Sequence, residues 1–130
     1  MRTIQPELTV VVPVFNEETN VEPMRNRLAE ALEDEVEGLE IIFVDDGSGD
    51  ETWTRIGALA AVDSRVRGLR FARNFGHQAA LTAGVDAASG RAVVIIDGDL
   101  QDPPEVIPEM VARWREGYEV VYGQRQERHG

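Results

Sequence analysis

Residues 92–105 read AVVIIDGDLQDPPE, an apolar run that ends abruptly in acidic residues. The apolar part, 92–96, is dominated by β-branched side chains and predicts a buried β-strand. In an extended chain alternate residues point to the same side, so Asp97, Asp99 and Gln101 would present three oxygen ligands together if the extended path continues. Two carboxylates and an amide oxygen suit Mg²⁺ or Mn²⁺. The stretch therefore predicts a divalent metal site at a strand end.

The composition describes one acidic domain. The chain has 130 residues, of which 42% are hydrophobic, and this is enough for a single domain with its own core. Its net charge of −11 argues against nucleic acid and against an anionic membrane surface as direct partners. The sequence contains neither cysteine nor lysine, which excludes disulfides, zinc–thiolate sites, thiol nucleophiles and Schiff bases. An anionic substrate would need a cation or arginine side chains to overcome the repulsion.

Strand-like and helix-like segments alternate along the chain. Short apolar runs predict strands at 8–14, 39–44, 66–72, 92–96 and 118–122. Apolar residues at helical spacing predict helices at 18–32, 51–62, 78–88 and 104–115. This alternation indicates βαβ units, and we expect an α/β fold of three layers in which helices cover both faces of a mainly parallel sheet.

Polar residues follow four of the predicted strands. Because ligands of open parallel sheets bind beyond the carboxyl ends of the strands, these segments predict a binding site along one edge. The segments are 13–17, 45–48, 73–77 and the acidic stretch that begins at Asp97.

Several of these residues also have ordinary structural explanations. Asn16 is a good N-cap, and Ser48 begins a capping-box pattern. Asp45 and Asp46 face opposite ways in an extended chain, so they do not form a dyad, and one of them can bind backbone amides in the turn. His77, at a predicted helix start, is expected to be a solvated or capping residue.

Taken together, the motifs resemble those of the inverting family 2 glycosyltransferases of the GT-A fold. Residues 11–18, VVPVFNEE, are similar to the opening motif of that family, and 44–48, VDDGS, to its second motif. Asp-Gly-Asp stands where the family has its metal-binding D-x-D. The longer strings 97–105 and 73–81 are similar to the branch that includes dolichol-phosphate mannosyltransferases and bactoprenol glucosyltransferases.

The resemblance implies a metal-dependent transfer of a sugar from a UDP- or GDP-sugar to a polyprenyl phosphate, with inversion. A phosphate acceptor is already ionised near pH 7, so no strong general base is expected and His77 receives no catalytic role. The implied catalytic residues are Asp97 and Asp99, and the implied ligands of Mg²⁺ or Mn²⁺ are Asp97, Asp99 and Gln101. The implied nucleotide-sugar-binding residues are Pro13, Phe15, Asn16, Glu17, Asp45, Asp46, Ser48, Arg73, Asn74 and Asp97.

The resemblance also implies how the chain is organised. Residues 1–123 are expected to form the nucleotide-sugar-binding, Rossmann-like half of a GT-A fold, and 124–130 a polar tail or truncation point. Acceptor-binding and membrane-associated segments follow this half in the family. We therefore expect donor binding without transfer by this chain alone. The full-length protein would lie in the cytoplasm at the inner face of the cell membrane.

Two other classes of protein fit parts of the pattern. A response-regulator receiver domain has a similar length and clustered aspartates, but its acid pair follows the first strand and it needs a lysine that this chain lacks. A nucleotidyltransferase shares the sheet type, but it normally carries a glycine-rich, basic loop after the first strand. Residues 13–17, PVFNE, are neither glycine-rich nor basic.

Overall fold

The computed structural model describes residues 5–117 and contains a four-stranded parallel sheet. The strand order is β3-β2-β1-β4, and β1 pairs with β2 on one side and with β4 on the other. The strands are β1 (Leu8–Val14), β2 (Leu39–Asp45), β3 (Val66–Arg70) and β4 (Ala92–Ile95). The predicted α/β class and parallel sheet are confirmed. The strand expected at 118–122 lies outside the described residues.

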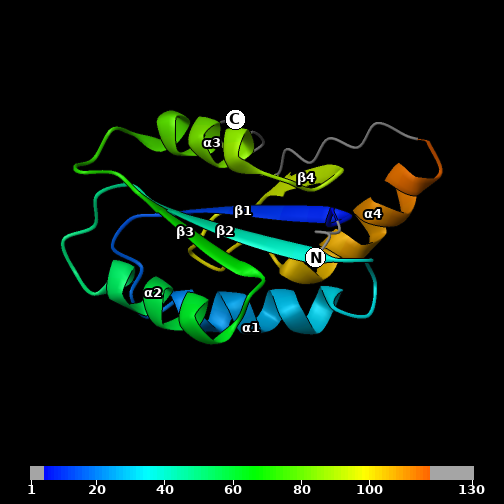
Figure 1. Cartoon of the computed structure of the whole chain (residues 1–130), viewed down its shortest axis with the longest axis horizontal. Coiled ribbons are helices and arrows are strands. Elements are labelled where there is room, and N and C mark those ends of the chain that lie inside the picture. The colour runs from blue at the N-terminus through cyan, green and yellow to red at the C-terminus, as the bar shows by residue number, and fades with distance from the viewer. Residues whose placement is uncertain (1–4, 118–130) are drawn as a thin grey trace.

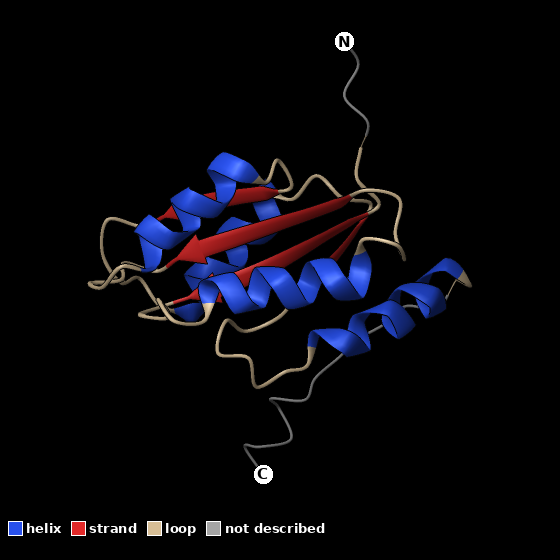
Figure 2. Ribbon diagram, turned by 90° about the horizontal axis from the view of Figure 1, so that it is seen from below, coloured by secondary structure: helices blue, strands red, loops and turns tan. Residues whose placement is uncertain are grey.

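Helices cover both faces of the sheet and complete the three predicted layers (Figure 1). One face is covered by α3, and the opposite face is covered by α1 and α2, with α4 packed beside α1 (Figure 2). The helices are α1 (Val21–Leu32), α2 (Thr52–Val62), α3 (His77–Ala87) and α4 (Ile107–Arg115), which follows the short 3₁₀ turn η1 (Pro104–Val106).

Two helices begin three residues later than the sequence predicts, because residues at their expected starts form other hydrogen bonds or turns. α1 begins at Val21 instead of 18, since Glu18 accepts a hydrogen bond from the Glu51 amide and Asn20 binds the Glu17 carboxylate. The helix expected from 104 starts as the η1 turn and becomes α-helical only at Ile107.

Strand β1 is buried along its whole length. Val10 and Val12 face the larger core cluster, beneath α1 and α4, whereas Val11 belongs to the smaller cluster beneath α3. Such burial on both faces requires the near-continuous apolar run that the sequence shows here. The polar residues that follow β1 are consequently held on a rigid base.

At the amino-terminal edge of the sheet, Glu40 holds several segments together. Its carboxylate accepts hydrogen bonds from the Thr9 hydroxyl at 2.7 Å, the Ser89 amide at 2.8 Å and the Arg67 guanidinium at 2.7 Å. Burial by itself would raise the pKa of Glu40, but these donors outweigh it, and the pKa is lowered. This edge is fixed by internal bonds.

A second buried acid, Glu7, ties α4 to the start of β1. Glu7 is 5% exposed and accepts two hydrogen bonds from Arg115, at 2.7 and 2.8 Å. Arg115 also donates to the backbone oxygen of Glu35. The hydrogen bonds from Arg115 lower the pKa of Glu7 from its ordinary value of 4.5 to about 2.

We expect Glu7→Gln to destabilise the protein at pH 7 by about 2 kcal/mol, because a buried, charge-assisted pair is lost. Since the pKa of folded Glu7 lies below 4.5, its contribution is complete above about pH 5 and is lost as the pH falls toward 2. Urea unfolding between pH 3 and 7 should therefore show a weaker pH dependence in the variant. Glu30→Gln, an exposed residue on α1, is the matched control. An unchanged pH profile in Glu7→Gln would contradict this assignment.

Two helix glycines give opposite expectations. Gly84 of α3 lies so close to β1 that an added Cβ would overlap Cγ1 of Val11, whereas Gly57 of α2 has open space around it. We expect Gly84→Ala to destabilise by about 1–3 kcal/mol through overpacking. Gly57→Ala should stabilise by about 0.5–1 kcal/mol, because alanine favours the helix. Thermal unfolding of both variants measures the difference, and equal shifts would argue against the close packing of α3 on β1.

Candidate functional site

A cavity of about 440 Å³ opens at the carboxyl edge of the sheet, where the predicted strand-end segments meet. All four strands send the chain to this edge, because they are parallel. The cavity is lined by Pro13, Val14, Phe15, Glu17, Asp46, Asn74, Gly76, His77, Ala80, Asp97, Gly98 and Asp99.

The loops after β1 and β2 are joined by reciprocal hydrogen bonds. The backbone amide of Asn16 donates a hydrogen bond to Ser48 Oγ at 2.8 Å, and the side-chain oxygen of Asn16 accepts one from the backbone amide of Gly49 at 2.9 Å. The Glu17 amide donates to the Thr52 hydroxyl at 2.9 Å. Asn16 adopts a φ of +54°, in the left-handed region that asparagine tolerates better than most residues. Asn16 and Ser48 thus hold the two loops in register beside the cavity.

The adjacent acids Asp45 and Asp46 face opposite ways, as predicted, and only Asp46 lines the cavity. Asp45 is fully buried and accepts a hydrogen bond from the Ser48 amide at 2.9 Å. Its other oxygen has no hydrogen-bond partner and lies 3.9 Å from Nε of Arg70, a distance that suits a weak ion pair but no hydrogen bond. Asp45 therefore orders the turn before α2.

Asp46 lines the cavity and also binds the loop after β3, which forms another part of the cavity wall. Its carboxylate accepts hydrogen bonds from the amide of Phe75 at 2.8 Å and the amide of Gly76 at 3.1 Å. The Asn74 side chain donates to the Asp46 backbone oxygen at 3.2 Å. Next to it, Gly47 has a φ of +79° and packs directly against the peptide group between residues 73 and 74. The loops after β2 and β3 are thereby joined.

The acidic stretch after β4 does not continue as an extended chain, and this premise of the sequence analysis was wrong. The Gly98 amide donates to the Pro13 backbone oxygen at 3.2 Å, and the chain then turns, with Leu100 at a φ of +64°. Asp97 and Asp99 both line the cavity, but Gln101 is exposed and does not. The backbone amide of Gln101 instead donates to Asp99 Oδ1 at 3.1 Å.

His77 lies on the cavity wall, although the sequence predicted for it only a solvated or capping role at a helix start. It is the first residue of α3, and its Nε2 lies 3.7 Å from Asp97 Oδ1. The helix start was predicted one residue later, and a histidine at a helix start has many ordinary uses. The available signal was its place at the end of one of the four strand-end segments.

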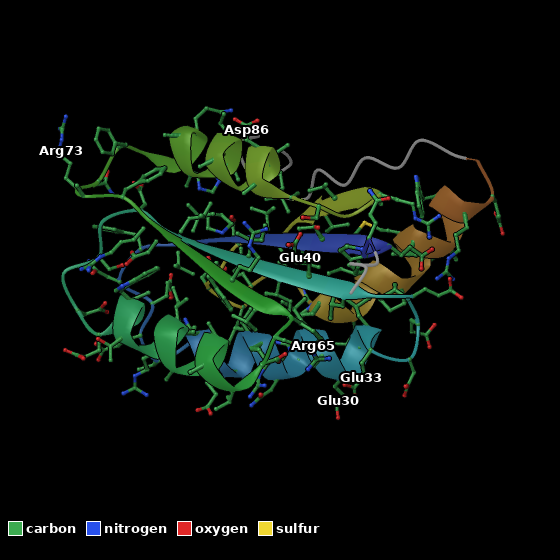
Figure 3. All side chains as sticks on the ribbon, in the orientation of Figure 1. Glu30, Glu33, Glu40, Arg65, Arg73 and Asp86 are labelled. Atoms are coloured by element: carbon green, nitrogen blue, oxygen red, sulfur yellow. The ribbon has the colours of Figure 1, made fainter. Side chains whose placement is uncertain are left out.

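The remaining predicted residues fall into two groups. Pro13, Phe15, Glu17 and Asn74 line the cavity. Arg73 lies on the loop tip beyond β3 and points away from the sheet (Figure 3), with its guanidinium 4.4 Å from the centre of the Phe75 ring. Within the described part of the chain, no arginine lines the cavity.

The cavity is acidic, with Glu17, Asp46, Asp97 and Asp99 on its walls. Asn20 donates to Glu17 at 2.6 Å, backbone amides donate to Asp46, and the Gln101 backbone amide donates to Asp99. Among residues 5–117, no three acidic or histidine side chains form a ready-made metal cage. Two carboxylates at a cavity wall still fit Mg²⁺ or Mn²⁺, which commonly bind one or two carboxylates together with substrate phosphates.

Comparison with known proteins agrees with these features. The model of the Glycosyl transferase family 2 matches residues 9–130. The chain belongs to this family. It is 48% identical over 124 residues to an uncharacterized glycosyltransferase of Bacillus subtilis, YkcC, covering 95% of this chain and 38% of the relative. It is 46% identical over 122 residues to the bactoprenol glucosyl transferase of Shigella phage SfV, covering 94% and 40%. The chain thus spans about two fifths of the length of these relatives.

Solved glycosyltransferases share the fold. The mannosyltransferase PcManGT from Pyrobaculum calidifontis, in complex with GDP-Man and Mn²⁺, matches with a TM-score of 0.69 at 26% identity, over 84% of this chain and 32% of that chain. Glucosyl-3-phosphoglycerate synthase from Mycobacterium tuberculosis, in complex with Mn²⁺ and UDP among its ligands, matches with a TM-score of 0.66 at 26% identity, over 84% and 39%. The predicted GT-A relationship is confirmed, and the receiver and nucleotidyltransferase alternatives are set aside.

The structure also addresses membrane crossing for the residues it describes. None of the helices in 5–117 has the length and apolarity needed to span a bilayer.

We expect Asp46→Asn to loosen the loop after β3, because one side-chain oxygen cannot replace two in binding the amides of Phe75 and Gly76. Hydrogen exchange at these two amides should become faster by about tenfold, the equivalent of about 1.4 kcal/mol. Asp86→Asn, an exposed change on α3, is the control and should leave both amides unaffected. Unchanged exchange in Asp46→Asn would show that the loop is held by other contacts.

Proposed function

We propose that this chain is the donor-binding part of a glycosyltransferase that moves a sugar from a UDP- or GDP-sugar to a polyprenyl phosphate, with inversion at the anomeric carbon. Membership of family 2 supports sugar transfer. The relative named bactoprenol glucosyl transferase supports a polyprenyl phosphate as the acceptor. A neighbour solved with GDP-Man supports a nucleotide-sugar as the donor.

The observation that carries the proposal is that carboxylates line a cavity that we propose binds the anionic diphosphate of the donor. A diphosphate would be repelled by Asp97 and Asp99 unless a cation lay between them. Within the described residues no arginine reaches the cavity wall to supply that charge. A bound Mg²⁺ or Mn²⁺ resolves the conflict, and structural neighbours solved with Mn²⁺ support such a role.

Each part of the cavity has a proposed task in binding the donor. Pro13 and Phe15 offer an apolar wall for the base, and Asp46 and Asn74 hold the loop that forms the other wall. Asp97 and Asp99 would hold the metal ion on the donor diphosphate. Asn16, Asp45 and Ser48 would act indirectly, by fixing the loops, while Arg73 and Gln101 lie outside the cavity lining.

The chemistry then requires little proton transfer from the protein. A bound metal ion would neutralise the charge that develops on the departing nucleoside diphosphate. The acceptor phosphate is ionised near pH 7, so its oxygen can attack the anomeric carbon without a general base. The rigid walls would present that carbon for attack from the face opposite the leaving group. We place this reaction at the cytoplasmic face of the cell membrane.

We expect this chain to bind either UDP or GDP in the presence of Mn²⁺, as measured by isothermal titration calorimetry. Asp99→Ala should weaken the Mn²⁺-dependent binding by at least about tenfold, because one of two metal ligands is lost. Asp86→Ala, which removes an exposed carboxylate far from the cavity lining, is the control. Binding that is equally tight without Mn²⁺, or unaffected by Asp99→Ala, would contradict the proposed metal site.

A further inference from the structure

The turn that follows the two cavity aspartates contains a leucine in a conformation that leucine rarely adopts. Leu100 has a φ of +64°, and the described non-glycine residues with positive φ are only Leu100 and Asn16. Asparagine tolerates this region through local hydrogen bonds of its short side chain, but leucine has no such compensation. A residue in this state persists only where its surroundings hold it.

The side chain of Leu100 makes the contact that stabilises this backbone conformation. It is partly buried and packs against the larger core cluster, the one beneath α1 and α4. The burial of this apolar side chain opposes the unfavourable backbone conformation. Leu100 therefore links the hydrophobic core to the acidic turn at the cavity.

Two further contacts fix the turn on either side of Asp99. Before it, the Gly98 amide binds the Pro13 backbone oxygen at 3.2 Å, and an added Cβ on Gly98 would overlap Val14. After it, the Gln101 amide donates to Asp99 Oδ1 at 3.1 Å. The position of that amide depends on the backbone of Leu100, which lies between the donor and the acceptor.

We propose that Leu100 is a positioning residue for the divalent cation. Its contact with the core holds the left-handed turn, the turn places the Gln101 amide on one oxygen of Asp99, and the carboxylate is thereby aimed into the cavity. This inference rests on the proposed function, since it concerns the same metal site. It assigns a role to an apolar residue that carries no ligand atom, and it explains why leucine stands where glycine or asparagine would be expected.

The experiment separates the side-chain anchor from the backbone conformation. Leu100→Gly and Leu100→Asn both permit a positive φ but remove the apolar anchor, whereas Leu100→Met keeps an apolar side chain of similar size. Mn²⁺ binding to the whole 130-residue chain is followed by the loss of the free Mn²⁺ signal in electron paramagnetic resonance, with UDP or GDP present. Nucleotide binding in EDTA and the melting temperature are measured on the same samples.

We expect Leu100→Gly and Leu100→Asn to weaken Mn²⁺ binding by about tenfold, as for other residues that orient metal ligands, and Leu100→Met to stay within about twofold of the wild type. Nucleotide affinity in EDTA should not change, because the rest of the cavity is untouched. A general structural role would lower both affinities together and would overturn the inference.

Comparison with Asp99→Ala distinguishes this inference from the proposed function. If Asp99→Ala abolishes Mn²⁺ binding while Leu100→Gly and Leu100→Asn retain wild-type affinity, the metal site stands and the role of Leu100 is wrong. If the wild-type chain and Asp99→Ala bind Mn²⁺ equally, the proposed metal site itself fails, and the role of Leu100 fails with it.

Discussion

Hydrogen bonding of β1 to both neighbouring strands is the constraint on which the rest of the structure depends. Because β1 lies inside the sheet and is buried on both faces, its residues must be apolar, and its carboxyl end cannot shift relative to β2 or β4. The loops after these strands therefore start from fixed points at one edge. Gly98 binds the Pro13 backbone oxygen, and the Asp46 amide binds the Val14 backbone oxygen, so neighbouring loops are joined through β1 itself.

In this acidic chain, the local donors decide what each carboxylate does. Glu7 and Glu40 accept hydrogen bonds from arginine side chains and stabilise the fold. Asp45 and Asp46 accept hydrogen bonds from backbone amides and hold the loops that follow β2 and β3 in place. Asp97 and Asp99 face a cavity whose described lining includes a histidine and an asparagine but no arginine. Two carboxylates on one cavity wall whose described lining holds no arginine favour a cation, and this supports the proposed chemistry.

The sequence was sufficient for the fold and for the edge of the sheet at which the cavity opens, but not for the path of each loop. The apolar run at 8–14 reports on local burial, and the strand predicted from it has the bounds that the structure shows for β1. The opposite directions of Asp45 and Asp46 also follow from strand geometry alone. The turn at Leu100 could not be predicted, because it depends on a distant core contact that overrides the backbone preference of leucine. His77 was missed since its place on the cavity wall depends on how α3 packs.

The close contact of Gly47 with the peptide group between residues 73 and 74 has a consequence for motion. Main chain packed on main chain leaves no side-chain rotamer that could absorb a displacement. Together with the hydrogen bonds from the amides of Phe75 and Gly76 to Asp46, this contact makes the loops after β2 and β3 one mechanical unit. Opening or closing of the cavity on this side must then be a concerted movement of both loops, and a ligand that touches either one restrains the other.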